Sequence, residues 1–463
     1  MNKSISFLTV SILLGSTALP TSAQTQATAP DMTALQKQIA ELNEKMAALE
    51  CAQKKSEAAA VAAAKKEIAQ STVSSEAASN WPAGYINVPG SNSAIKFGGF
   101  VKADFIYDGN ASSGGDAFDP ANMPLKSVDS GATKSGQFRA HGRGTRLNMA
   151  TLSNTPKGDL KTFFEIDFFG SNANNGTSYA PRLRHAYGEF NNVLIGQTFS
   201  NFLDVSALGS NLDSNGLSSS SLRQPMVKYT MNVANNVTFA AAVEKPNTDY
   251  LDSEAKTKSN EDDGVSNFPD ITGQLRWSGN MGHVSFRGLA RQVAVKSEKS
   301  TANVTRKATG WGLGMSGRLI ITNSTALFGQ INGGDAIGRY MFDPAPSAYY
   351  SPTSGRFGTR AVYQGILGVE QKLTDTVRGN LAVSHERISN PTSLMLNDNA
   401  TGNYNTKVQK VIATLIYSPV EKVDMGVEAS LGRREAVRLE TGKTPTTKDA
   451  TGTRVQFVAM YRF

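Results

Sequence analysis

The segment Arg454-Val-Gln-Phe-Val-Ala-Met-Tyr-Arg-Phe463 indicates how the rest of the chain folds. Every second residue from Val455 to Phe463 is apolar, and the residues between them form a mixed, more polar face. That alternation is typical of a β-strand with one face in lipid and the other in water. Tyr461 and Phe463 stand where a membrane strand places aromatic rings at the headgroup level. We therefore expect a membrane-spanning strand at this end of the chain.

The bulk composition excludes a helical membrane protein. The chain has 463 residues, of which 39% are hydrophobic, and a mean hydropathy of −0.30. After residue 23 no apolar run approaches the roughly 20 residues that a spanning helix needs. A transmembrane barrel tolerates such polarity, because half of each strand faces a wet interior.

Residues 1–23 are expected to form a secretory signal. Lys3 supplies the positive charge, Phe7 to Leu14 the apolar core, and Thr21-Ser-Ala23 the small-residue cleavage site. Gln24 follows that site where a lipoprotein would have Cys, so we expect an exported chain without a lipid anchor.

Metal and redox chemistry have little support in the sequence. Cys51 is the only cysteine, so no intramolecular disulfide can form. The four histidines are dispersed without ligand spacing: His141, His185, His283 and His385. We expect no metal and no other cofactor.

A heptad pattern predicts a helix over residues 31–50, with Asp31 as a plausible N-cap. Its apolar positions alternate steps of three and four: Met32, Leu35, Ile39, Leu42, Met46 and Leu49. We interpret residues 24–70 as a short parallel coiled coil joining three chains, the alternative being an amphipathic helix docked on its own barrel. Residues 71–93 are typical of a linker.

Residues 94–463 predict an all-β fold, a 16-stranded antiparallel transmembrane barrel. The alternating runs lie at about 94–108, 138–152, 159–170, 182–190, 193–202, 225–234, 237–245, 269–278, 283–296, 309–321, 325–335, 358–372, 376–388, 406–417, 423–436 and 452–463. Short and long connections alternate between them. This pattern favours a meander with short periplasmic turns and long outer loops, closed so that no strand edge remains.

Several segments are similar to those of the DcaP-like porins. They are Pro89 to Asp104, Arg182-Leu-Arg-His-Ala-Tyr-Gly188, Gly196 to Phe202, Ile337-Gly-Arg-Tyr340, Tyr417-Ser-Pro419 and Glu428 to Arg434. Phe199 stands where the family would have Trp. The resemblance implies a trimeric diffusion channel of the Gram-negative outer membrane, with a periplasmic N-terminal helix and a preference for dicarboxylates.

Strand parity predicts a net positive barrel interior. The inward-facing bases are Lys96, Lys102, Arg146, Lys228, Arg276, Arg287, Arg291, Arg318, Arg378, Arg434 and Arg454. The inward-facing acids are Asp104, Glu165, Asp167, Glu244, Glu370, Glu386 and Glu428. Such charges should face inward, because Arg or Lys on the lipid face costs about 2–4 kcal/mol at mid-bilayer. A basic ring in a narrow pore attracts anions, and the guanidinium fork suits carboxylates.

The constriction is expected near Lys102, Arg146, Arg184, Arg276 and Arg318. Further lining residues are Arg287, Arg378 and Arg434, with Asp104, Glu165 and Asp167 as the acidic part of the lumen. Thr145-Arg-Leu-Asn-Met149 resembles the second-strand motif of general porins, whose Arg lines the eyelet.

Three points in this region stay open. The parity of Arg184 fits either strand register. Arg139, His141 and Arg143 have the opposite parity from Arg146, which places them above the membrane or beyond a bulge. The connection at 203–224 either folds into the barrel, as in related porins, or is an ordinary outer loop.

The function that these patterns favour is passive diffusion of small anions, including dicarboxylates, through a homotrimeric porin in the outer membrane. A trimeric adhesion or structural protein without conductance is one alternative. A sugar porin is another, although most strand aromatics have lipid-facing parity. Gly310-Trp-Gly-Leu-Gly314 lies within strand alternation and opens no helix, so it does not indicate a nucleotide site. We expect neither an enzyme nor nucleic-acid binding.

Overall fold

The computed structural model describes residues 81–110, 115–125, 135–170, 179–213, 217, 222–259, 264–296, 305–341 and 343–463, and a few residues between 37 and 61. The chain divides into two units, Met1–Asn80 and Trp81–Phe463. In the first unit the described residues are helical. The predicted signal at 1–23, most of the predicted coiled coil at 24–70 and the first part of the linker at 71–93 lie outside the described residues, so they stay predictions. No helix in the described part of the chain is both long and apolar enough to cross a membrane.

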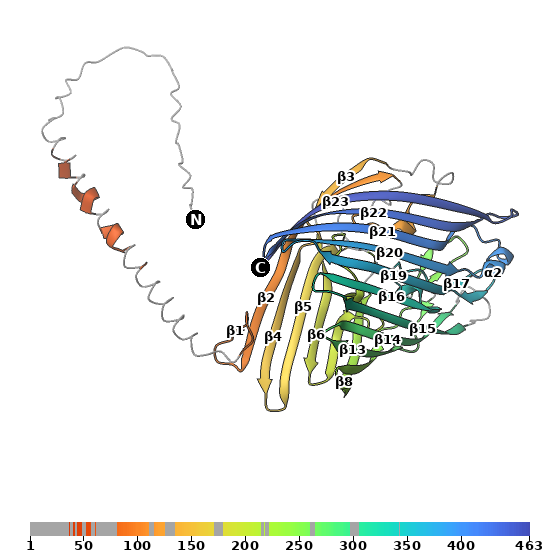
Figure 1. The fold of residues 1–463 in the computed structure, drawn as a ribbon, viewed down its shortest axis with the longest axis horizontal. Coiled ribbons are helices and arrows are strands. Elements are labelled where there is room, and N and C mark those ends of the chain that lie inside the picture. The colour runs from red at the N-terminus through yellow and green to blue at the C-terminus, as the bar shows by residue number, and fades with distance from the viewer. Residues whose placement is uncertain are drawn as a thin grey trace, which may run out of the picture. The chain divides into compact units, whose positions relative to one another are not determined.

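The second unit is a closed antiparallel barrel of sixteen strands, as predicted (Figure 1). β3 (Gln137–His141) and β4 (Arg146–Thr155) together make one of these strands, because both pair with β2 (Ser93–Asn110). The others are β5 (Gly158–Gly170), β6 (Ala180–Phe190), β7 (Val193–Phe199), β8 (Arg223–Ala234), β9 (Val237–Glu244), β13 (Asp270–Gly279), β14 (Gly282–Lys296), β15 (Thr305–Ile320), β16 (Thr325–Asp335), β19 (Ala361–Lys372), β20 (Val377–Ser389), β21 (Gly402–Val420), β22 (Val423–Leu439) and β23 (Thr446–Arg462).

The last strand closes the barrel against the first. β23 pairs with β2 from Phe100 opposite Arg462 to Asp108 opposite Arg454, so neither strand is left as an edge. The short strands β1 (Ile86–Asn87) and β12 (Gly264–Val265) add to β2 and β14 without forming part of the ring.

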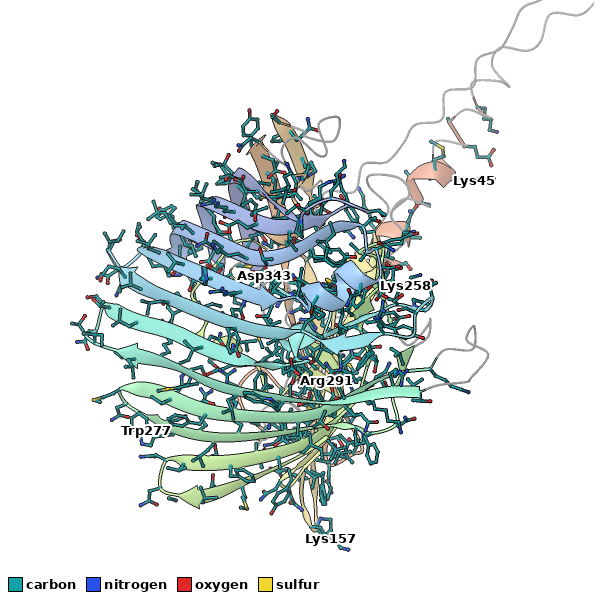
Figure 2. The ribbon with its side chains drawn as sticks, turned by 90° about the vertical axis from the view of Figure 1, so that its right-hand side faces the viewer. Lys45, Lys157, Lys258, Trp277, Arg291 and Asp343 are labelled. Atoms are coloured by element: carbon teal, nitrogen blue, oxygen red, sulfur yellow. The ribbon has the colours of Figure 1, made fainter. Side chains whose placement is uncertain are left out.

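Short turns lie at one end of the barrel and long loops at the other. The turns at Asn191-Asn192 and Asn235-Asn236 each place one asparagine at positive φ, Asn191 at 52° and Asn236 at 64°. Two-residue hairpins need that conformation, and asparagine tolerates it better than most residues. Trp277 lies near the short-turn end and Lys258 at the long-loop end, with Arg291 between them (Figure 2).

Some strand limits differ from the predicted ones. β21, β22 and β23 extend further toward the long loops, because their polar ends continue to pair above the apolar band. β7 ends at Phe199 instead of residue 202, since the chain there turns into the barrel.

The long loops carry structure that the sequence did not predict. β10 (Tyr250–Leu251), β11 (Thr257–Lys258), β17 (Ala348–Tyr350) and β18 (Phe357–Thr359) form a separate four-stranded sheet. Leu251, Tyr349 and Met395 are buried together, and Met395 belongs to the short helix α2 (Thr392–Asn397). This sheet and helix form a small apolar core at the long-loop end.

Candidate functional site

Residues 200–213, here called the crossing loop, leave β7 and run inside the barrel. The loop is anchored by apolar side chains: Phe202, Leu203 and Leu212 are all buried. Phe202 packs in a cluster with Leu289 and Val362, which are inward-facing residues of β14 and β19. Burial of these side chains stabilises the loop inside the barrel, since an outer loop would leave them in water. The crossing loop therefore folds into the lumen, which decides between the two possibilities for residues 203–213 of the connection at 203–224.

Polar contacts attach the crossing loop to strands around the barrel. Asp204 accepts hydrogen bonds from Ser316 at 2.6 Å and pairs with His283 at 2.8 Å. The Ser210 hydroxyl donates to Glu370, and the backbone N–H groups of Leu212 and Asp213 donate to Glu428. At its far end Asp213 pairs with Arg454 at 3.1 Å, and Lys102 Nζ donates to the Leu212 carbonyl at 2.7 Å. The loop thus has contacts from β14 round to β23 and β2.

The Asp204 carboxylate is one of the most enclosed of these anchors, with a side chain only 1% exposed. Burial by itself raises its pKa, but the hydrogen bond from Ser316, the pairing with His283 and the attraction of Arg276 together lower the pKa below its usual value of 3.8. Asp204 is therefore held in its charged form inside the barrel.

A second charged group lies on β4, β5 and β6. Arg184 pairs with Glu165 at 2.7 Å and with Asp167 at 2.9 Å. Arg182 adds a pair with Asp167 at 2.6 Å, and Arg146 lies 3.9 Å from Glu165. Three guanidinium groups thus share two carboxylates. This group, here called the basic wall, retains excess positive charge.

A β-bulge explains why the parity of Arg184 was ambiguous. Glu165 on β5 pairs with His185, but the next residue, Ile166, pairs with Leu183, so Arg184 has no partner of its own in the ladder. Leu183 is exposed while Arg184 and His185 are both buried. The extra residue therefore directs two consecutive side chains inward.

A second irregularity separates β3 from β4. Asp104 pairs with His141, whereas Phe100 pairs with Arg146, so β3 and β4 have one residue more than β2 over this interval. Of the two alternatives left open for these residues, the structure shows the bulge, which turns Arg139 and His141 inward despite their parity.

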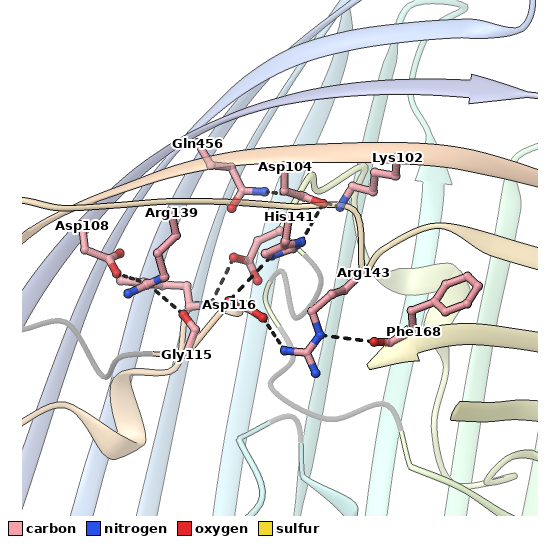
Figure 3. Close-up of polar contacts among 12 residues, drawn as sticks. Lys102, Asp104, Asp108, Gly115, Asp116, Arg139, His141, Arg143, Phe168 and Gln456 are labelled. Carbon is pink, nitrogen blue, oxygen red and sulfur yellow. Dashed lines mark hydrogen bonds and ion pairs between the residues drawn. The ribbon is translucent and has the colours of Figure 1, made fainter. Parts of the chain in front are cut away.

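The residues of β3 join a polar network with the loop that follows β2 (Figure 3). Lys102 lies 2.9 Å from Asp104, His141 is 3.7 Å from the same carboxylate, and Arg143 pairs with Asp116. Phe118, on the same loop as Asp116, donates its N–H to Asp213 of the crossing loop. Residues 115–125 are therefore a second segment that enters the barrel. The sequence signals it only by the apolar residues Phe118, Met123 and Leu125, which the structure buries.

Two of the cavities that the described residues form lie at opposite ends of the barrel. One of about 410 Å³ lies among the short turns and is lined by Arg318, Lys372 and Arg378 with Glu370 and Asp375. The other, about 630 Å³, lies below the long loops; Arg339, Arg360 and Arg434 line it together with Asp343 and Glu386.

The predicted bases fall into two sets. Lys102, Arg184 and Arg287 have little exposed surface and hold other groups in place; Arg287 donates to the Phe202 carbonyl at 2.6 Å. Arg434 likewise donates to the Met123 carbonyl. Arg146, Arg276, Arg318 and Arg378 keep roughly a quarter to a third of their side-chain surface exposed. The three predicted acids, Asp104, Glu165 and Asp167, are all buried in ion pairs. Within the described residues, no group of His, Cys, Asp and Glu has an arrangement that could hold a metal ion.

The family model described as DcaP outer membrane protein matches residues 19–449. The chain belongs to the DcaP family. The crystal structure of the outer membrane channel DcaP of Acinetobacter baumannii is similar to this fold with a TM-score of 0.67 and 22% sequence identity, covering 82% of this chain and 99% of that one. Porin Omp2b of Brucella suis is 24% identical over 313 residues, which is 66% of this chain and 73% of the porin. Porin Omp2b of Brucella canis has the same identity and coverage.

This DcaP-family chain is therefore an outer-membrane porin of the Gram-negative type. The family and the fold are those of channels rather than enzymes. In this setting the crossing loop, the basic wall and the two cavities make up the candidate permeation site.

Proposed function

We propose that this porin passes small anions, carboxylates among them, by passive diffusion. The observation that carries the proposal is an asymmetry within five interior ion pairs whose arginine keeps exposed surface. Arg276 is 26% exposed and its partner Asp204 only 1%, while Arg378 is 32% exposed and Asp424 5%. Arg146, Arg182 and Arg318 are likewise more exposed than the carboxylates with which they pair. A solute in the interior therefore meets guanidinium surface more than carboxylate surface.

This asymmetry favours anions for two physical reasons. The low-dielectric wall focuses the field of charges that face the lumen, which concentrates counter-ions there. An exposed guanidinium also offers a carboxylate two parallel N–H donors. Because each Arg already shares its charge with a buried acid, binding at any one site is weak enough for release, which passive conduction requires.

The path that we propose runs past three groups of bases. Arg339, Arg360 and Arg434 line the cavity below the long loops. Arg146, Arg182 and Arg276 lie near the crossing loop and the basic wall, and Arg318, Lys372 and Arg378 line the cavity at the short turns. A dicarboxylate could contact two neighbouring bases at once, whereas a monocarboxylate would use one.

We also propose that the porin is a homotrimer with its N-terminal segment in the periplasm. The heptad over residues 31–50 supports this, as does the helical conformation of the described residues between 37 and 61. A short coiled coil needs partner helices, and three equal barrels would supply them.

The substrate class can be tested with channels in planar bilayers. We expect succinate to reduce the chloride current at lower concentration than acetate does, while an uncharged sugar of similar size has little effect. Equal block by the sugar and the dicarboxylate would contradict the anion proposal. A porin that shows no stepwise conductance would contradict the channel function itself.

A further inference from the structure

The outer surface of the barrel carries a group of bases that the permeation path does not use. His385 and Arg387 are exposed on β20, and Lys407 on β21 and Arg433 on β22 are 34% and 50% exposed. Here these four residues are called the outer basic cluster. They share the parity of Val383, Val411 and Leu431, which are exposed on the lipid-facing side. The cluster therefore belongs to the outside of the barrel.

Strand register places the cluster directly above the apolar band. His385 is opposite Gln409, and Gln409 is opposite Arg433, so these residues form one row across three strands. Val383, Val411 and Leu431 form the next row toward the short turns. The row beyond His385 toward the long loops contains Arg387 opposite Lys407. From one row to the next toward the long loops, apolar side chains are replaced by basic ones. Lipid headgroups on the long-loop side lie at the level of this change.

The charge of the cluster is not neutralised by the protein. Glu435 pairs with Lys407 at 2.9 Å and with Arg433 at 3.1 Å, so one carboxylate serves two bases. Arg387 forms no ion pair with any residue that the structure describes, although it stands opposite Lys407. Like charges on directly opposite strand positions repel each other. An anion in contact with Arg387, Lys407 and Arg433 would remove that repulsion.

An apolar groove of about 800 Å³ begins beside His385 and Arg387. Phe286, Leu313, Met315 and Ile331 line it. Gly333 and Gly365 contribute no side chain to its surface, and a Cβ on Gly365 would meet only the Ile331 side chain, at 3.9 Å. The groove is thus open at Gly365, next to His385 in the register. A long alkyl chain fits such a groove, whereas a soluble anion would gain nothing from contact with its apolar side chains.

We propose that the outer basic cluster and this groove form a binding site for one phosphorylated lipid of the outer leaflet. The lipid's phosphate would lie against Arg387, Lys407 and Arg433, and one acyl chain would lie in the groove beside Gly365. The combination of excess positive charge with an adjoining apolar groove commits the site to a lipid that carries phosphate near its acyl chains, such as lipopolysaccharide.

Native mass spectrometry of the full-length protein with purified lipopolysaccharide tests the site. Wild-type protein should retain the lipid, and the variant Arg387→Glu with Arg433→Glu should bind it at least about tenfold more weakly, since charge-assisted contacts to phosphate are lost. Gly365→Leu, which fills the groove but keeps every base, should also weaken binding. Lys157→Glu makes the same type of charge change at an exposed turn of the opposite end and should bind as wild type does.

Any one of the following four outcomes would overturn the proposal. Equal binding of dephosphorylated lipopolysaccharide by the wild-type protein would show that phosphate is not recognised. Full competition by inorganic phosphate, with no effect of Gly365→Leu, would indicate an anion site without a lipid. Dissociation of an oligomer by Gly365→Leu would show that a second copy of the chain occupies the groove. Equal loss of binding in Lys157→Glu would leave only a general charge effect.

Discussion

The Nε2 atom of His283 lies 2.8 Å from the Oδ2 atom of Asp204, and this contact joins the crossing loop to the wall at β14. The same carboxylate accepts the Ser316 hydroxyl, and its other oxygen lies 3.4 Å from Arg276. One side chain thus connects the loop to three strands. If the loop narrows the lumen, movement of the loop changes the width of the pore. The contacts of Asp204 then limit how much that width fluctuates.

Asp204→Asn should loosen this anchor, because the amide cannot accept as many hydrogen bonds and carries no charge. Loss of a charged partner from such buried contacts costs about 3 kcal/mol. We expect a lower temperature for the loss of the folded, heat-modifiable band on gels, and a noisier single-channel current. Ser206→Ala, on the same loop, keeps the carboxylate and should behave as wild type; equal noise in both variants would contradict the anchoring role.

The contribution of Asp204 should depend on pH. Its pKa in the folded protein is lowered from 3.8, so its stabilising contribution is complete above pH 3.8 and is lost as the pH falls through the lower folded value. The difference in melting temperature between wild type and Asp204→Asn should therefore shrink as the pH falls below about 4. A difference that grows below about pH 4 would contradict this assignment.

Phe202→Ala tests the apolar part of the loop anchor. Phe202 is 0% exposed among Leu289, Tyr340 and Val362, and removing a buried aromatic ring costs about 3–5 kcal/mol. We expect a larger open-channel conductance together with a lower melting temperature. Phe105→Ala, on the lipid-facing side of β2, is the matched control, since its ring is already exposed outside the barrel. Unchanged conductance in Phe202→Ala would mean that the loop does not limit the current.

Deletion of residues 24–80 tests the N-terminal segment. If its heptad joins three chains, the shortened protein should fold as a barrel but yield fewer or less heat-stable trimers, which size-exclusion chromatography with light scattering would measure. Substituting Ile39 and Leu42 by Asp should reproduce this effect in the full-length chain. Trimers that persist unaltered in both variants would assign the segment another role.

The barrel itself could be predicted from the sequence because lipid imposes a strict alternation. Val455 and Phe457 are 49% and 41% exposed while Gln456 between them is 1% exposed, so parity alone assigned their faces. The alternation of short and long connections likewise predicted sixteen strands, which is the number in the structure.

Parity failed where a bulge adds a residue. At Arg184 and between His141 and Arg146 the backbone shifts by one position, and no local residue pattern marks such a shift in advance. The roles of the interior bases could not be predicted from the sequence either. Parity placed both Lys102 and Arg146 inside the barrel. It could not predict that Lys102 is buried against the crossing loop, where it donates to the Leu212 carbonyl, while Arg146 stays partly exposed.

The small sheet at the long-loop end was missed for a similar reason. Tyr250 and Ala348 lie far apart in sequence and pair only because the barrel brings their loops together. Strands of two or three residues are too short to show an alternation of their own.

The reversal potential in a salt gradient tests the central claim most directly. Channels of the wild-type protein should prefer chloride over potassium, and the double variant Arg146→Glu with Arg276→Glu should shift the reversal potential toward cations, because both guanidiniums are exposed in the interior. Lys157→Glu, at an exposed turn, is the control and should leave the potential unchanged. Cation preference in the wild type, or a reversal potential that the double variant does not alter, would contradict the account.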